Sequence, residues 1–153
     1  MVTLTNHTSN RLLNSTIRDV VARLLVHHGH EGAGVEIVIM EPGAIRELNR
    51  DYRQMDEATD VLTFPAPPNP MGHLGEIAIN IRDVRRGAAH RMVSHTHEAT
   101  ALAIHGALHL LGYDDETEPE RDEMVRLMND HLRRENMKVD ENWASLPHAE
   151  EIY

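Results

Sequence analysis

The spacing of apolar residues divides the chain into helical and strand-like segments. Apolar side chains in residues 10–27 recur every three or four positions, which predicts an amphipathic helix. Residues 35–40 place them at every second position, which is typical of a strand that buries one face. On these two patterns we predict strands at 2–6, 35–40, 59–64 and 74–81. We predict helices at 10–27, from Pro42 to about Tyr52, at 83–92, at 96–111 and from Pro119 to about 135.

The predicted elements follow one another in the order βαβαββααα. A helix between two strands of one sheet makes a right-handed crossover and leaves those strands parallel. We therefore expect the first three strands to be mostly parallel. The fourth is expected to join as an antiparallel partner through the proline-rich loop at 66–71. The prediction is an α/β fold with a four-stranded mixed, mostly parallel sheet and about five helices.

The length of the chain indicates a single domain. Its 153 residues suit one hydrophobic core, and we find no internal repeat and no linker. We assign residues 1–136 to this domain. Residues 137–153 are polar and lack periodicity, which predicts a flexible C-terminal tail.

Composition restricts the chemistry and the compartment. The chain has no cysteine, so a metal ion would have to be held by His, Asp or Glu. The absence of cysteine also fits a reducing compartment. Residues 1–10 lack the apolar segment of a secretion signal, and no stretch approaches the ~20 apolar residues of a membrane helix. We expect a cytoplasmic protein with no membrane partner. The net charge of −10 argues against extensive phosphate binding by this chain alone.

Residues 103–116, AIHGALHLLGYDDE, have the spacing of a metal site. His105 and His109 lie four apart on a predicted helix, so both imidazoles leave the same face. Gly112 can end the helix in the left-handed conformation and turn the chain back. Asp115 can then supply a carboxylate oxygen as the third ligand. Three protein ligands leave a position open for water, which is typical of a catalytic zinc site.

Three other interpretations of the same residues remain open. Histidine pairs at this spacing also arise by chance, because the chain has twelve histidines. A zinc peptidase of the metzincin type has the same ligand skeleton, but it places its general base, a glutamate, directly after the first histidine. This chain has Gly106 there, which disfavours a peptidase. A metal that only stabilises a non-catalytic protein is the third interpretation.

The segment resembles the signature of the YbeY family of bacterial endoribonucleases, H-G-x-L-H-L-x-G-Y-D-H. The matching residues are His105, Gly106, Leu108, His109, Leu110, Gly112, Tyr113 and Asp114. A second block is similar to the family's L-N-x-x-Y-R-x-x-D-x-x-T-D-V-L-S-F-P. Its matching residues are Leu48, Asn49, Tyr52, Arg53, Asp56, Thr59, Asp60, Val61, Leu62, Phe64 and Pro65. A third block is residues 74–77, and together the similarity covers roughly residues 35–128.

The resemblance implies a function and partners. Residues 1–136 would form a metal-dependent hydrolase domain with one zinc ion at His105, His109 and Asp115. The protein would be a single-strand-specific endoribonuclease in ribosomal RNA maturation, including the 3′ end of 16S rRNA, and in ribosome quality control. Its partners would be ribosomal RNA and small-subunit proteins, with no DNA expected. The alternative from the same resemblance is a non-catalytic ribosome-assembly factor. The family's functionally important arginine corresponds to Arg53, a candidate to bind phosphate oxygens.

One residue departs from the family pattern. The signature usually ends in histidine, and this chain has Asp115 there. Aspartate is an acceptable zinc ligand, but its negative charge makes the metal a weaker acid. We therefore predict a higher pH optimum than that of an all-histidine site. Asp114 is the alternative ligand, although its family counterpart is not one.

Several other polar residues are candidates of lower specificity. Glu76 and Asp60 are possible neighbours of the site without an assigned role. A solvated helix arginine, or one paired with Asp56, is the alternative interpretation of Arg53. The basic residues that could follow an RNA backbone are Arg82, Arg85, Arg86 and Arg91. A solvated helix face is the alternative interpretation of this cluster, and the one favoured when the cluster is considered alone. The histidines that we interpret as helix-end or surface residues are His27, His28, His30, His95 and His97.

Overall fold

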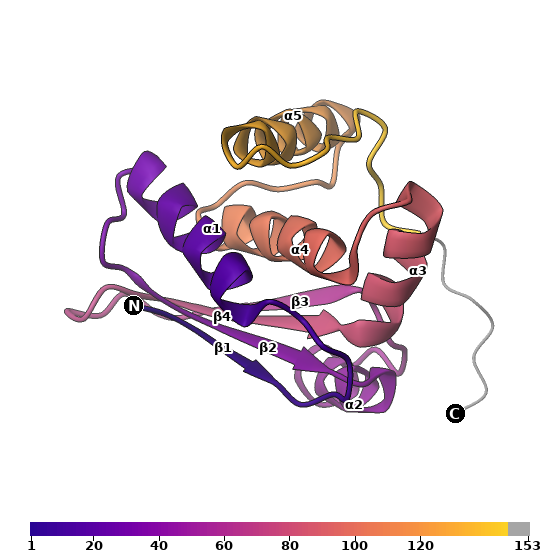
Figure 1. Cartoon of the computed structure of the whole chain (residues 1–153). Helices are drawn as coiled ribbons and strands as arrows, with labels where there is room; N and C mark the ends of the chain where they lie inside the picture. The colour runs from indigo at the N-terminus through magenta and orange to yellow at the C-terminus, as the bar shows by residue number, and fades with distance from the viewer. Residues whose placement is uncertain (147–153) are drawn as a thin grey trace.

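A four-stranded sheet runs through the centre of the structure, a computed structural model that describes residues 1–146 (Figure 1). The strands are β1 (Val2–Asn6), β2 (Gly34–Met40), β3 (Val61–Pro65) and β4 (His73–Asn80). The helices are α1 (Asn14–His27), α2 (Pro42–Arg53), α3 (Ile81–Arg91), α4 (His95–Leu110) and α5 (Glu118–Arg134). This order confirms the predicted α/β fold with a mixed four-stranded sheet and five helices.

The order of strands in the sheet is β1-β2-β4-β3, which corrects one detail of the predicted topology. The strands β1, β2 and β4 are parallel, and the antiparallel strand is the third rather than the fourth. Differences in burial explain why β4, and not β3, takes the inner position in the sheet. In β4, Ile77, Ala78 and Ile79 are all buried, so both faces of this strand are covered. In β3 only Leu62 is buried, which suits a strand at the edge of the sheet.

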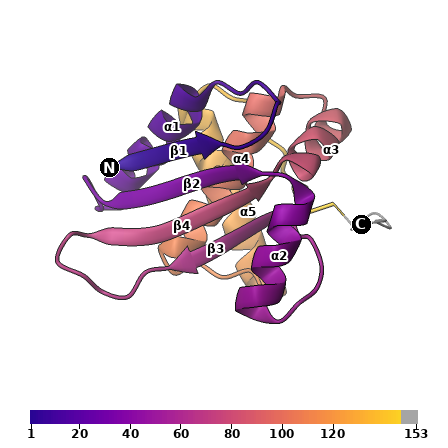
Figure 2. The same cartoon turned by 90° about the horizontal axis from the view of Figure 1, so that it is seen from below.

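Helices cover both faces of the sheet (Figure 1 and Figure 2). The helices α1 and α4 pack on one face, and α5 lies on the outer side of α4. The helix α2 lies on the opposite face, below β4 and β3. Alternation along β4 therefore separates two environments: Ile77 and Ile79 belong to the core with α4, whereas Ala78 packs with Ile45 of α2.

The boundary of α1 differs most from its prediction. The helix begins at Asn14 rather than at residue 10. Asn6 accepts a hydrogen bond from the Thr8 backbone N–H at 2.9 Å and donates from its amide to the Asn10 carbonyl oxygen at 2.8 Å. This local turn uses the backbone groups of the segment before the helix, because asparagine side chains compete well for them.

The chain beyond α5 is part of the packed structure as far as it is described. Trp143 is only 7% exposed and belongs to the main core, and Met137 and Val139 pack against the same core. Asn129 of α5 donates to the Asp140 carbonyl oxygen at 3.0 Å and accepts from the Asp140 N–H at 3.2 Å. Residues 137–146 are thus attached to the domain, although the sequence predicted a flexible tail from residue 137. The rest of the predicted tail, 147–153, lies outside the described residues.

No helix within residues 1–146 combines the length and the apolar character that crossing a membrane requires.

Candidate metal centre

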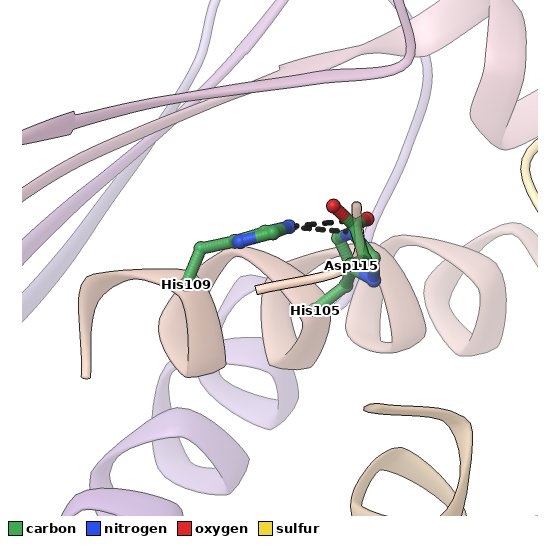
Figure 3. A group of neighbouring side chains, drawn as sticks. All are labelled: His105, His109 and Asp115. Carbon is green, nitrogen blue, oxygen red and sulfur yellow. Dashed lines mark hydrogen bonds and ion pairs between the residues drawn. The ribbon is translucent and has the colours of Figure 1, made fainter. Parts of the chain in front are cut away.

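Two histidines leave α4 on the same side, one turn apart (Figure 3). The Nε2 atoms of His105 and His109 lie 3.0 Å from each other. His105 is only 6% exposed, and His109 is half-buried. The helix can lie this close to β4 because residue 106, between the two histidines, is glycine. A Cβ at that position would lie 2.7 Å from Cγ2 of Ile77 on β4, closer than side chains pack.

A tight turn after α4 brings the third residue to the histidines. The Gly112 N–H donates to the His109 carbonyl at 2.9 Å, and the Tyr113 N–H donates to the Leu108 carbonyl at 3.1 Å. These two bonds form a Schellman motif, and Gly112 takes the positive φ of 99° that the motif requires. Asp115 Oδ2 then lies 3.3 Å from His105 Nε2 and 3.4 Å from His109 Nε2.

The three side chains could hold a metal ion. One donor atom from each of His105, His109 and Asp115 lies within 4.8 Å of the others, and the donors are two imidazoles and a carboxylate, as zinc prefers. Hydrogen bonding from His105 is the largest effect that lowers the pKa of Asp115, to about 2, with burial opposing it. The carboxyl group is therefore ionised, as a ligand must be.

The other nitrogen of His105 faces the core. Its Nδ1 lies 3.4 Å from the sulfur of Met128 on α5, and its ring lies 5.3 Å from the Trp143 ring at an angle of 34°. Histidines that bind metal usually donate from their second nitrogen to a carboxylate or carbonyl oxygen. Here a thioether, a weaker acceptor, takes that place. Packing by Met128 and Trp143 therefore fixes the orientation of this ring more than hydrogen bonding does.

The metal-binding group opens onto a cavity of about 480 Å³. Arg53, at the end of α2, lines the same cavity, and its Nη2 donates to the Thr63 carbonyl at 2.6 Å. Its guanidinium lies 5.8 Å from the centre of the Phe64 ring. The alternative partner, Asp56, forms an ion pair with Arg46 at 2.8 Å. The structure therefore places the candidate phosphate-binding arginine in the cavity of the metal-binding group.

Two of the three remaining acidic candidates line the cavity, and the third lies on the other face of the sheet. Asp60 lines the cavity, accepts a hydrogen bond from the Val61 N–H at 2.8 Å and accepts another from the Ser145 hydroxyl. Asp114 also lines the cavity but is not in the group that could hold a metal. Glu76 is exposed beside Phe64 and Met40, on the α2 face of the sheet. It is therefore not a neighbour of the metal-binding group.

The four arginines in and at the end of α3 have partners within the chain. Arg82 and Arg86 both pair with Asp83 at 2.8 Å, and Arg85 donates to Asn10 at 2.6 Å. Arg91 is buried and pairs with Glu98 at 2.6 Å. Phosphate binding by these guanidinium groups would therefore have to compete with partners in the same chain.

The histidines outside the motif have different surroundings. His95 and His97 belong to the first turn of α4, and His95 Nδ1 lies 3.3 Å from the Asn10 amide. His27 and His28 end α1 and contact His131 of α5. The interpretation as helix-end residues holds for His27 and His28, but it missed their contact with α5.

Sequence reasoning also missed two residues that line the site, Trp143 and Ser145. Both lie in the segment predicted to be a tail. One feature of the sequence could have indicated that this segment packs against the domain. Trp143 is the single tryptophan of the chain, and such a large apolar side chain is rarely left fully exposed.

The structure is a single α/β domain in which two histidines and one carboxylate line an open cavity beside an arginine, an arrangement typical of metal-dependent hydrolases. The chain belongs to the Endoribonuclease YbeY family, whose model matches residues 3–136. The resemblance noted in the signature is thereby confirmed.

Individual relatives agree with this family. The chain is 38% identical over 133 residues to the Endoribonuclease YbeY of Geobacillus thermodenitrificans, covering 80% of this chain and 83% of that protein. It is 36% identical over 108 residues to that of Acholeplasma laidlawii, covering 71% and 79%. It is 40% identical over 103 residues to that of Nitrobacter winogradskyi, where the match spans only 54% of the relative.

A solved structure has the same fold. The solution structure of TM1509 from Thermotoga maritima superimposes with a TM-score of 0.61 over 89% of this chain and 92% of that one. At 23% sequence identity this similarity supports the fold and no further property.

Proposed function

We propose that this protein is a metal-dependent endoribonuclease that cleaves single-stranded RNA during ribosomal RNA maturation. The proposed roles include processing of the 3′ end of 16S rRNA and ribosome quality control, in the cytoplasm. The observation that supports a hydrolase best is that His105, His109, Asp115 and Arg53 line one open cavity. A structural zinc site would instead be closed by four protein ligands.

The residues of the cavity suit phosphodiester hydrolysis. When bound, a zinc ion supplies Lewis acidity and an acidified water. His105, His109 and Asp115 hold the ion, and Trp143 and Met128 fix the His105 ring. Arg53 binds phosphate oxygens and offsets the negative charge that grows in the transition state. Its bond to the Thr63 carbonyl and its contact with Phe64 orient the guanidinium toward that task.

A peptidase is the less well supported function for the same group of residues. Position 106, where a metzincin has its glutamate base, packs against Ile77 of the sheet. A carboxylate cannot occupy that space. Both the identity of the residue and its location therefore argue against peptide hydrolysis.

RNA binding in this proposal depends on partners. The chain has a net charge of −10, and the α3 arginines already pair with internal groups. We therefore propose that ribosomal RNA is presented together with small-subunit proteins, which supply additional contacts.

The first experiment is metal analysis of the purified protein beside His109→Ala and Asp115→Ala. We expect the wild type as purified to retain about one equivalent of tightly bound zinc and both variants to retain much less, as for a three-ligand site. Full retention of metal by Asp115→Ala would remove Asp115 as a ligand. No metal uptake by the wild type would contradict a metal-dependent hydrolase.

The second experiment separates an enzyme from a non-catalytic assembly factor. We expect Arg53→Ala to retain zinc but to cleave single-stranded RNA about 100-fold more slowly, as when a group that stabilises transition-state charge is removed. Arg50→Ala is the matched control, because Arg50 lies in the same helix, is exposed and, among residues 1–146, pairs with its neighbour Asp51 alone. Cleavage unaffected by both Arg53→Ala and His109→Ala would point to a contaminating nuclease and an assembly role.

A further inference from the structure

A second pair of histidines lies between α1 and α5, outside the site described above. His28 is the residue that ends α1, and His131 lies in the last turns of α5. Their Nε2 atoms are 2.9 Å apart, although the residues are separated by 103 positions in the sequence. His27 is the third imidazole of this cluster, with its ring 5.4 Å from that of His28 and 5.5 Å from that of His131.

The geometry of this pair matches that of the first centre. The Nε2 atoms of His105 and His109 are 3.0 Å apart, and those of His28 and His131 are 2.9 Å apart. Two nitrogens bound to one zinc at about 2.0–2.1 Å in a tetrahedral arrangement lie roughly 3.3 Å apart. Either pair accommodates an ion if its rings separate by a few tenths of an ångström.

Both imidazoles are neutral at neutral pH, so neither has to lose a proton before it binds a metal. The Nε2 atom that donates in their hydrogen bond frees its lone pair when its proton moves to Nδ1 of the same ring. Burial is the main effect that lowers the pKa of His131, to about 4, and the pKa of His28 is also lowered chiefly by burial. His131 is only 4% exposed, so it has lost much of its access to water. A metal ion therefore does not compete with protons for these nitrogens at neutral pH.

We propose that His28 and His131 form a second binding site for a borderline divalent metal ion such as Zn²⁺, bridging α1 and α5. The site lies at the C-terminal end of α1, where the helix dipole favours a cation. His27 supplies a third nitrogen if its ring turns away from Arg134, to which its Nε2 is bonded at 3.0 Å. Water completes the coordination.

Surrounding charges make this site weaker than the first. The guanidinium of Arg134 acts against a positive ion beside His28 and His131, and Asp130 acts in its favour beside His131. The first centre has an ionised carboxylate among its ligands, and this pair has none within the described residues. We therefore expect the first centre to fill before the second.

The test is a titration of Zn²⁺ into metal-free protein, followed by calorimetry. The wild type should bind about two equivalents, with the second more weakly, whereas His28→Gln and His131→Gln should bind about one. The His105→Ala, His109→Ala double variant should retain only the second site, so failure here is distinct from failure of the proposed function. His7→Gln is the control, because His7 is exposed and outside the cluster.

A second readout covers the case in which His131→Gln folds poorly. In the double variant that lacks the first centre, Zn²⁺ should raise the melting temperature, since an ion that joins two helices binds the folded state. Adding His28→Gln to that variant should abolish the rise. Binding of a single equivalent of Zn²⁺ by the wild type, or of two equivalents by His28→Gln, would overturn the proposal. The contact between His28 and His131 would then be only a hydrogen bond between two imidazoles.

Discussion

At the scale of single residues, two glycines of the metal-binding segment act in different ways. Gly106 allows α4 to approach β4, because any side chain there would meet Ile77. Gly112 allows the chain to reverse after α4 with a φ of 99°, which brings Asp115 back to the histidines. The first glycine supports packing and the second supports the geometry of the ligands.

We expect Gly106→Ala to lower the free energy of unfolding by about 1–3 kcal/mol, the usual cost of overpacking a core. The added Cβ would lie 2.7 Å from Ile77 Cγ2, so the helix or the strand must shift. Urea unfolding measures this loss. Ile77→Ala should restore part of it in the double variant, and Gly43→Ala is the control, because nothing lies within 4 Å of a Cβ there. Equal stability of Gly106→Ala and wild type would contradict the close contact.

We expect Gly112→Ala to weaken zinc binding at the first centre as well as the fold. A side chain in the left-handed region costs about 1–2 kcal/mol, and relief of that strain displaces Asp115. Gly32→Ala is the matched control. Gly32 also has a positive φ, of 78°, and open space around it, but it lies outside the metal-binding segment. Competition with a zinc chelator measures affinity. If both variants lost stability but kept the wild-type affinity, the turn would have no part in placing Asp115.

Asp115 is the residue that should set the pH dependence of cleavage. Replacing it with histidine removes one negative charge from the ligand set, which leaves the metal a stronger Lewis acid. Asp115→His should therefore have its pH–rate profile shifted to lower pH. The measurement is the rate of RNA cleavage across pH at saturating zinc, and superimposable profiles would contradict the idea.

At the scale of elements, the contact between α1 and α5 depends on two imidazoles that are held neutral. Burial, with smaller contributions from neighbouring His28 and Arg134, lowers the pKa of His131 from 6.5 to about 4. The unfolded chain binds a proton at this residue below pH 6.5, whereas the folded chain does so only near pH 4. Stability from His131 is therefore present above pH 6.5 and is lost as pH falls toward 4.

We expect the wild type to lose more stability than His131→Gln between neutral and mildly acidic pH, by at most about 3 kcal/mol. Urea unfolding with a metal chelator present measures this difference without contribution from bound zinc. His90→Gln is the control, since His90 is exposed on α3 and should leave the loss unchanged. The same loss in all three proteins would show that His131 is not held neutral.

At the scale of the whole molecule, the segment after α5 returns to the metal centre. Trp143 packs against the His105 ring, and the Arg91 guanidinium lies 4.8 Å from the Trp143 ring centre. Arg91 in turn joins Glu98 of α4 to Asp140. These contacts connect α3, α4 and the C-terminal segment around one side of the site.

We expect truncation after residue 136 to destabilise the protein strongly and to weaken zinc binding. Loss of a buried tryptophan side chain alone costs about 3–5 kcal/mol, and His105 loses the ring that packs against it. Thermal unfolding and zinc affinity should both fall, and Trp143→Ala should reproduce most of the effect. A chain ending at residue 146 is the control, because it keeps every contact described for Trp143. Unchanged stability of the shorter chain would restore the view that the domain ends at 136.

Local sequence was sufficient to predict the helices, the strands and the candidate ligands of the metal site. Helical and strand periodicities are local, and so is the spacing of His105, His109 and Gly112. An i, i+4 pair on a helix has its geometry set within one turn, and the glycine-dependent turn then places Asp115 a few residues later. These features require no knowledge of distant contacts, which is why they could be predicted.

Features that depend on distant partners could be identified only in the folded chain. The position of β3 at the edge follows from burial of both faces of β4. Pairing of the α3 arginines, burial of Trp143 and the approach of His28 to His131 join residues far apart in sequence. Such contacts depend on how whole elements pack, because the free energy of burying one side chain depends on every surface around it. The periodicity of one segment does not contain that information.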